Sequence, residues 1–317
     1  MKTLLEVLNS GTEYLTKQGC PEARSVMQHL MAHVLQCNRT YLYSHFDRPL
    51  SEGELLPLRE LLKKKAQGIP LQHLLGTTEF YRREFLTDSR ALIPRPETEE
   101  LVEFVLKYAT GSGLRVLDMG TGSGIIGITL ALELGSRLQD VTLADISRQA
   151  LDLALENAMR LGVKAATVQT DLFEAFDQED PSAANTVKIG KQESEASGIK
   201  EEHSFSPPQK FDIIVANLPY IADHEPLDRE VTFDPASALY GGPQGWEIIE
   251  RFLSEAPAYL TPDGMVALEI GYDQDRKVEE IMLSLGYRSI AILRDLNGIP
   301  RFPMGKRPTE SALNVRT

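Results

Sequence analysis

The chain has 317 residues, which is enough for one large domain and one small domain. With 42% hydrophobic and 25% charged residues, its composition is that of an ordinary globular protein. No apolar run approaches the roughly 20 residues of a membrane span, and the first residues lack the apolar core of a signal peptide. We therefore expect a cytoplasmic protein without membrane contact. Cys20 and Cys37 are too few for a disulfide framework, so we expect reduced, buried thiols, and we expect no metal site.

The charge balance argues against nucleic acid as a substrate. The formal net charge is −13 and the isoelectric point is about 5.0, so the chain as a whole does not attract phosphate backbones. The short basic cluster Lys63–Lys65 is a local exception, which we interpret as the solvated end of a helix.

The first 75 residues predict a small all-helical domain. Apolar residues recur at helical spacing, and Ser51 with Glu54 forms a capping-box pattern before a stripe of leucines. Met27 and Met31 could line a groove for a partner, but methionines at helical spacing are more often core residues. No catalytic constellation occurs here, so we assign residues 1–75 to substrate recognition.

Residues 76–93 predict a short β-like connector, and we assign residues 94–317 to a catalytic domain. The segment Ile93–Glu99 reads Ile-Pro-Arg-Pro-Glu-Thr-Glu and leads into a helical pattern. Its two prolines fix the backbone, so taken alone it is a rigid linker that ends in a helix cap.

From Leu114 onward, strand patterns alternate with helix patterns, which predicts a parallel sheet with helices on both faces. The fold class is therefore α/β, a doubly wound, seven-stranded sheet with a small N-terminal helical domain. Residues 177–209 are polar and lack an apolar period, so we interpret them as a flexible surface insertion; a phosphorylation or docking segment is the alternative. The expected strands, of which the last two could pair antiparallel, lie near 114–118, 141–145, 165–169, 211–216, 265–270, 288–293 and 311–316.

Two motifs follow strands of this sheet. The strand at 114–118 runs into a glycine-rich turn, so that Asp118–Gly124 reads Asp-Met-Gly-Thr-Gly-Ser-Gly, and the strand at 211–216 ends in the tetrad Asn-Leu-Pro-Tyr, residues 217–220. Open α/β sheets bind ligands at the carboxyl ends of their strands. The glycine-rich turn and the tetrad together resemble those of the S-adenosylmethionine-dependent methyltransferases that modify planar amine or amide nitrogens.

The glycine-rich turn is the expected cofactor site. Its glycines allow a tight turn and a close approach of the backbone, and the free N–H groups of the following helix favour a carboxylate such as that of S-adenosylmethionine. Nicotinamide-binding folds use a similar turn, but with Gly-x-Gly-x-x-Gly spacing. Asp145 ends the next strand, where it can accept both ribose hydroxyls, and Asp171 with Leu172 could contact the adenine, unless Asp171 is only a helix cap. The expected cofactor-binding residues are Gly120, Thr121, Gly122, Ser123, Gly124, Asp145, Asp171, Leu172 and Asn217.

The tetrad predicts chemistry on an amide or exocyclic amine. Such a nitrogen is a poor nucleophile because its lone pair is conjugated. Acceptors aimed at both of its N–H bonds would orient it and stabilise the developing positive charge. The side-chain oxygen of Asn217 and the carbonyl of Leu218 can supply two acceptors, and Tyr220, after Pro219, can stack on the planar group. Alone, the same four residues could simply be a turn after a strand.

With these motifs in view, the chain resembles the peptide chain release factor glutamine N5-methyltransferases, the HemK/PrmC family. The resemblance rests on residues 93–99, 118–124 and 217–220, and it covers nearly the whole chain apart from 177–209. Further matches are Pro235 to Gly242, residues 268–271 with Gln274, and residues 295–301.

The resemblance implies that the substrate is the glutamine of the Gly-Gly-Gln loop in class I release factors, with the helical domain helping to hold that protein. It implies S-adenosylmethionine as the cofactor, bound by the glycine-rich turn and Asp145, and it gives Asn217 contacts to both substrate and cofactor. Alongside it, we assign to the substrate site Asn217, Leu218, Pro219, Tyr220, Pro94, Arg95, Pro96 and Glu97.

Leu218 departs from the family, which usually has Asn-Pro-Pro-Tyr here. A leucine still offers its backbone carbonyl, so we expect reduced rigidity and retained activity. One rival interpretation is an adenine N6-methyltransferase that uses the same tetrad on a flipped base, against which the acidic charge argues. The other is a binding protein that keeps the cofactor pocket without turnover, against which the intact motifs argue.

Overall fold

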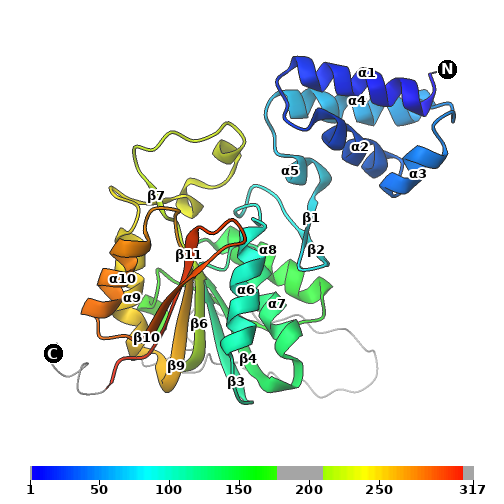
Figure 1. Ribbon diagram of the computed structural model, residues 1–317. Coiled ribbons are helices and arrows are strands. Elements are labelled where there is room, and N and C mark those ends of the chain that lie inside the picture. The colour runs from blue at the N-terminus through cyan, green and yellow to red at the C-terminus, as the bar shows by residue number, and fades with distance from the viewer. Residues whose placement is uncertain (1, 177–209, 310–317) are drawn as a thin grey trace, which may run out of the picture. The chain divides into compact units, whose positions relative to one another are not determined.

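The computed structural model describes residues 2–176 and 210–309 and divides the chain into two compact units (Figure 1). The first unit comprises residues 1–78, 87–89 and 227–233, and the second comprises 79–86, 90–226 and 234–317. The expected insertion at 177–209 and the strand expected at 311–316 lie outside the described residues. None of the helices formed by the described residues is long and apolar enough to cross a membrane.

The first unit is built on five helices that pack around leucines and methionines. Met27 and Met31 are both 0% exposed, so these methionines belong to the core. The capping box predicted for Ser51 and Glu54 is confirmed, because the Glu54 carboxylate accepts from the backbone N–H of Ser51 at 2.8 Å. The cysteines are free but only half-buried. The helices are α1 (Leu4–Lys17), α2 (Ala23–Val34), α3 (Arg39–Ser44), α4 (Glu52–Ala66) and α5 (Leu71–Leu75).

The first unit also takes in a segment from far along the chain. Residues 227–233 include the short 3-10 helix η3 (Val231–Phe233) and pack with the helices of this unit. Lys65 is 4% exposed and forms an ion pair with Glu230 at 2.6 Å. The expectation that Lys63–Lys65 is a solvated helix end is therefore wrong for Lys65, whose charge is compensated by a partner 165 residues away in sequence.

The connector between the predicted domains forms a two-stranded sheet of β1 (Thr77–Phe80) and β2 (Arg83–Leu86). After it, α6 (Glu97–Tyr108) begins directly behind Pro96. The boundaries 1–75, 76–93 and 94–317 remain a proposal, since the compact units interleave in sequence.

The second unit holds a seven-stranded sheet in the order β10-β11-β9-β6-β3-β4-β5. The five strands from β9 to β5 in that order are parallel, whereas β11 runs antiparallel to both β9 and β10. The strands are β3 (Leu114–Met119), β4 (Leu138–Asp145), β5 (Ala166–Gln169), β6 (Phe211–Asn217), β9 (Leu260–Glu269), β10 (Arg288–Arg294) and β11 (Pro300–Lys306).

Helices cover both faces of this sheet, as the alternating pattern predicts. Figure 1 shows α6, α7 (Ile125–Leu134) and α8 (Arg148–Arg160) on one face, with α9 (Glu247–Glu255) and α10 (Asp275–Ser284) on the other. Each face has its own apolar core, and β3 and β6 contribute to both because alternate side chains of a strand point to opposite faces. The fold class predicted from the sequence is confirmed.

The seventh strand lies earlier in the chain than predicted. Residues 300–306 pair with β10 and β9, so the antiparallel partner of β10 follows directly after the turn at Asp295–Gly298. The sequence hides this strand because Pro300, Pro303 and Gly305 are typical of turns. A further parallel pair, β7 (Ile221–Ala222) and β8 (Tyr240–Gly242), follows the tetrad.

Candidate active site

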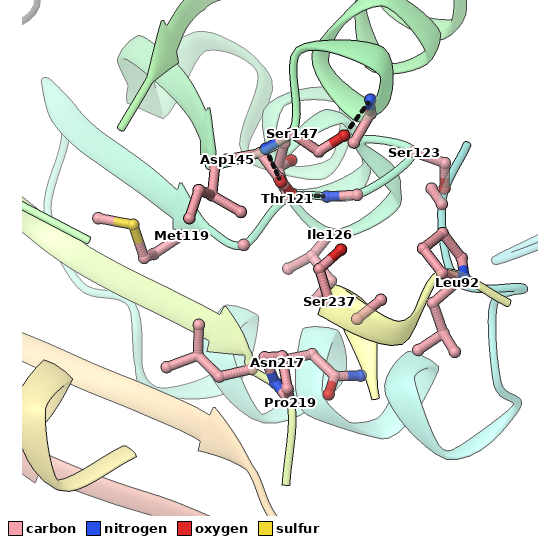
Figure 2. A pocket seen from close by; sticks show the side chains of 18 of the residues that line it. Leu92, Met119, Thr121, Ser123, Ile126, Asp145, Ser147, Asn217, Pro219 and Ser237 are labelled. Atoms are coloured by element: carbon pink, nitrogen blue, oxygen red, sulfur yellow. Dashed lines mark hydrogen bonds between the residues drawn. The ribbon is translucent and has the colours of Figure 1, made fainter. Parts of the chain in front are cut away.

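A cavity of about 280 Å³ lies where the strand order of the sheet reverses. β3 and β6 are neighbours in the sheet but are followed by connections that lead in opposite directions, and this arrangement opens a crevice at their carboxyl ends. Residues from the glycine-rich turn, from the ends of β4 and β6, and from segments 90–98 and 235–240 line the cavity. Figure 2 shows Thr121, Asp145 and Ser147 on one side of it and Asn217 with Pro219 on the other.

The glycine-rich turn is held by hydrogen bonds to a buried carboxylate. The Asp118 Oδ2 atom accepts from the Thr121 hydroxyl at 2.6 Å and from the backbone N–H of Gly127 at 2.8 Å. Burial raises the pKa of Asp118 to about 6. The φ angles of Gly120, Gly122 and Gly124 are 68°, 55° and 84°, a region that residues with a Cβ rarely adopt. The four residues from Gly120 to Ser123 line the cavity, whereas Gly124 does not.

Asp145 ends β4 and reaches the same turn. Its Oδ2 accepts from the backbone N–H of Gly122 at 2.9 Å, and its Oδ1 accepts from the backbone N–H of Ser147 at 2.8 Å (Figure 2). Burial raises the pKa of this carboxyl group. Each oxygen retains a further lone pair, so the carboxylate is fixed in place and can still accept from a bound diol.

Two further features fit a polar cofactor in this half of the cavity. Ser123 lines the cavity, and its Oγ atom is buried without a hydrogen-bond partner among the described residues. Buried hydroxyls are normally hydrogen-bonded, so this unpaired Oγ is a candidate contact for a bound ligand. The fully buried Asn157 donates to the carbonyl of Ser123 at 2.9 Å and exchanges hydrogen bonds with the backbone of Leu86. Asn157 thereby supports the turn, a role that its place in a helical pattern does not signal.

Asp171 and Leu172 both line the cavity, as expected of adenine contacts. The carboxylate of Asp171 forms an ion pair with Arg251 of α9, which fixes its position but also occupies part of its acceptor capacity. Leu172 is buried with a φ of 49°. The assignment of these two residues to the adenine stays a prediction.

The tetrad divides between the cavity and the core. Asn217, Leu218 and Pro219 line the cavity, whereas Tyr220 does not. The carbonyl of Tyr220 accepts from the side chain of Gln274 at 2.9 Å, so the tetrad is tied to the loop after β9. Burial, with the nearby Glu269 as the next cause, raises the pKa of Tyr220 to about 12, so this hydroxyl stays protonated.

Leu218 takes a position that depends on a glycine. Its side chain is 4% exposed and belongs to the core on one face of the sheet. A Cβ added to Gly120 would lie 3.0 Å from Leu218 Cδ2, which is closer than side chains normally approach. Leucine at this position therefore joins the tetrad to the glycine-rich turn by packing, a contact that the sequence did not reveal.

The proline-rich segment contributes only part of what was expected. Pro94 and Arg95 line the cavity, but Pro96 and Glu97 do not. Arg95 donates to the buried Asp234 at 3.3 Å, and Asp234 also accepts from the backbone N–H of Ile93 at 3.2 Å. These contacts hold the segment against the wall of the cavity.

Two buried residues behind the tetrad were missed as site residues. The Thr98 hydroxyl donates to the Glu269 carboxylate at 2.7 Å, and the side-chain amide of Asn217 donates to the Thr98 oxygen at 3.3 Å. Glu269 ends β9 directly opposite Asn217 in the sheet. Both residues stand in segments that carry the family resemblance, 93–99 and 268–271, but locally Thr98 looks like an ordinary residue of a helix start and Glu269 like the end of an apolar strand.

Comparisons with known proteins identify families and a solved structure to which the chain is similar. Residues 6–76 match the PrmC N-terminal domain family, and residues 110–281 match a methyltransferase domain family. The solved structure of a release factor-specific protein-(glutamine-N5) methyltransferase from Alicyclobacillus acidocaldarius is similar over 71% of this chain and 100% of that chain, with 24% identity and a TM-score of 0.38.

Full-length relatives are more similar in sequence. The release factor glutamine methyltransferase of Koribacter versatilis is 35% identical over 311 residues, which cover 97% of this chain and 99% of that protein. The release factor glutamine methyltransferase of Bacillus subtilis is 33% identical over 310 residues, or 95% of this chain and 96% of that protein. The chain belongs to the release factor glutamine methyltransferase family.

Proposed function

We propose that this enzyme methylates the side-chain amide nitrogen, N5, of the glutamine in the Gly-Gly-Gln loop of class I peptide chain release factors. S-adenosylmethionine is the methyl donor. The observation that carries the proposal is the placement of Asn217 at one side of a cavity whose other side is formed by the glycine-rich turn and Asp145. Membership of the family supplies the class of substrate.

When bound, S-adenosylmethionine supplies a methyl group on a positively charged sulfur, from which a nucleophile can take it in line. The residues of the chain then have to bind and orient the two reactants. Asp145 would hold the ribose hydroxyls, while Ser123 and the free N–H groups at the start of α7 would hold the amino-acid end of the cofactor.

The glutamine amide needs acceptors rather than a strong base. The oxygen of the Asn217 side chain and the carbonyl of Leu218 would accept from its two N–H bonds. These contacts orient the nitrogen and stabilise the positive charge that develops on transfer. Tyr220 remains a proposed stacking partner, and Pro94 and Arg95 remain proposed contacts to the protein substrate, since both line the cavity.

An adenine N6-methyltransferase is not favoured. The net charge of −13 opposes nucleic acid, and in the short basic cluster Lys63–Lys65 the Lys65 side chain is buried and paired with Glu230. The relatives that cover nearly the whole chain carry the release factor name.

The test is transfer of labelled methyl from S-adenosylmethionine to a purified class I release factor, with a factor carrying Gln→Ala in its Gly-Gly-Gln loop as the control. Label on the native factor alone is the expected result. Label on neither factor, or on an adenine-containing oligonucleotide instead, would overturn the proposal.

A further inference from the structure

The half-buried Asn217 of the tetrad is hydrogen-bonded in series to two buried polar side chains, Thr98 and Glu269. Asn217 comes from the end of β6, Thr98 from the first turn of α6, and Glu269 from the end of β9. Thr98 and Glu269 are each 1% exposed. Polar groups this deeply buried are costly unless they are paired, and here they are paired only with one another and with groups at the site.

The single proton of the Thr98 hydroxyl fixes the direction of these hydrogen bonds. A threonine hydroxyl has one proton, and Thr98 gives it to the ionised Glu269 at 2.7 Å. The group that approaches the Thr98 oxygen from the other side, at 3.3 Å, must therefore be a donor, and it is the amide nitrogen of Asn217.

The orientation of the Asn217 amide decides what it offers to the cavity. Nitrogen and oxygen occupy the two branches of one planar group, so holding the nitrogen at Thr98 leaves the oxygen as the free branch. Asn217 lines the cavity, and its oxygen accepts no hydrogen bond from the other described residues. A flipped amide would instead turn its NH2 toward the substrate N–H, so that two hydrogen-bond donors would face each other.

We propose that Thr98 and Glu269 are positioning residues that lock the Asn217 amide with its oxygen toward the glutamine N–H. The inference rests on the proposed function for the identity of that N–H group. The ionised carboxylate, which can only accept, sets the direction for both of the other side chains.

Protonation of Glu269 should release this lock. Burial raises the pKa of Glu269 to about 7, although Thr98, Arg301 of β11 and Asn217 act to lower it; Glu97 of α6 raises it further. The other titratable group beside this carboxyl is the hydroxyl of Tyr220, whose own pKa lies far higher. A protonated Glu269 can donate to Thr98, which then can donate to the Asn217 oxygen. Activity should therefore fall as the pH falls through about 7.

The first test compares two substitutions at one position. Thr98→Val keeps the shape but removes the hydroxyl, so kcat should fall roughly tenfold to a hundredfold, the loss of one oriented acceptor. The Kd of S-adenosylmethionine should stay within threefold. Thr98→Ser keeps the hydroxyl and should retain kcat within threefold. A Thr98→Val enzyme with kcat within threefold of the native value, or an equal loss in both variants, would overturn the inference.

A second test does not depend on methyl transfer. The side-chain amide resonance of Asn217 in the 15N-labelled protein is identified by its loss in Asn217→Asp. It should shift with a midpoint near pH 7 in the native protein and show no such midpoint in Glu269→Gln. An unchanged midpoint in Glu269→Gln would refute the lock. A titration that follows Glu269 in a protein that labels no release factor would leave the lock standing and refute the proposed function.

Discussion

The two sides of the cavity are built in different ways. The cofactor side is made mostly of one continuous stretch, Gly120–Ser123, with Asp145 as its main side chain. The tetrad side depends on side chains brought together across the fold, since Asn217 meets Thr98 over 119 residues and Thr98 meets Glu269 over 171. One side is a local structure, and the other is a product of tertiary packing.

The two sides are therefore vulnerable to different substitutions. A backbone site tolerates changes in its side chains as long as the turn keeps its conformation. A site that relies on a buried polar chain loses its geometry when any member is removed, because the remaining groups are left unpaired in the interior. The two sides should therefore respond to substitution in different measurements, the tetrad side in kcat and the cofactor side in cofactor affinity.

The largest expected effect is that of Asn217→Ala. Removing the acceptor should lower kcat roughly a hundredfold to a thousandfold, as measured for single groups that stabilise transition-state charge. Single-turnover methylation of a release factor gives the rate. Asn297→Ala, an asparagine in the exposed turn between β10 and β11, is the matched control and should leave the rate unchanged. If Asn217→Ala acted only through a raised Kd of the cofactor, the division between the two sides would fail.

Leu218 tests the packing that joins the two sides. Leu218→Ala removes a buried side chain and should lower the free energy of unfolding by about 2–3 kcal/mol in urea denaturation. The effect on kcat should stay below tenfold, because the residue acts through its backbone carbonyl. Leu296→Ala, at a side chain that is 92% exposed, should change stability by less than about 0.5 kcal/mol. A hundredfold faster Leu218→Pro enzyme would show instead that leucine impairs the tetrad.

Asp145→Asn tests the cofactor side. The amide keeps the size of the carboxylate but replaces one acceptor oxygen by a donor, so one hydrogen bond to the ribose or to the turn is lost. The Kd of S-adenosylmethionine, measured by calorimetry, should rise roughly tenfold to a hundredfold. Asp152→Asn on the surface of α8, where the native carboxylate pairs with Arg148, should leave the Kd within twofold. A normal Kd with a lowered kcat in Asp145→Asn would show that this carboxylate acts in the transfer step rather than in binding the cofactor.

The contrast also explains what the sequence could predict. The glycine-rich turn, Asp145 and Asn217 could be predicted because each stands in a short pattern after a strand. The pairing of Thr98 with Glu269 could not be predicted, although both stand in segments that carry the family resemblance, because nothing local links residues 171 positions apart. For the same reason Pro96 and Glu97 were assigned to a cavity that they do not line, although their neighbours Pro94 and Arg95 do. The strand Pro300–Lys306 could not be predicted because its prolines and glycine disfavour a strand locally, and pairing with β10 and β9 overrides that preference.

The smallest expected effect concerns residues 177–209, which lie outside the described residues and between β5 and β6 in sequence. Their polar composition without an apolar period predicts no part in either side of the cavity. Replacing them with a short Gly/Ser linker should leave kcat and KM for the release factor within twofold, measured on the same factor as the native enzyme. A replacement that raised KM tenfold while the Kd of S-adenosylmethionine stayed unchanged would assign the segment to the protein substrate. The tetrad side would then extend beyond Asn217 and the two buried residues, Thr98 and Glu269, that orient its amide.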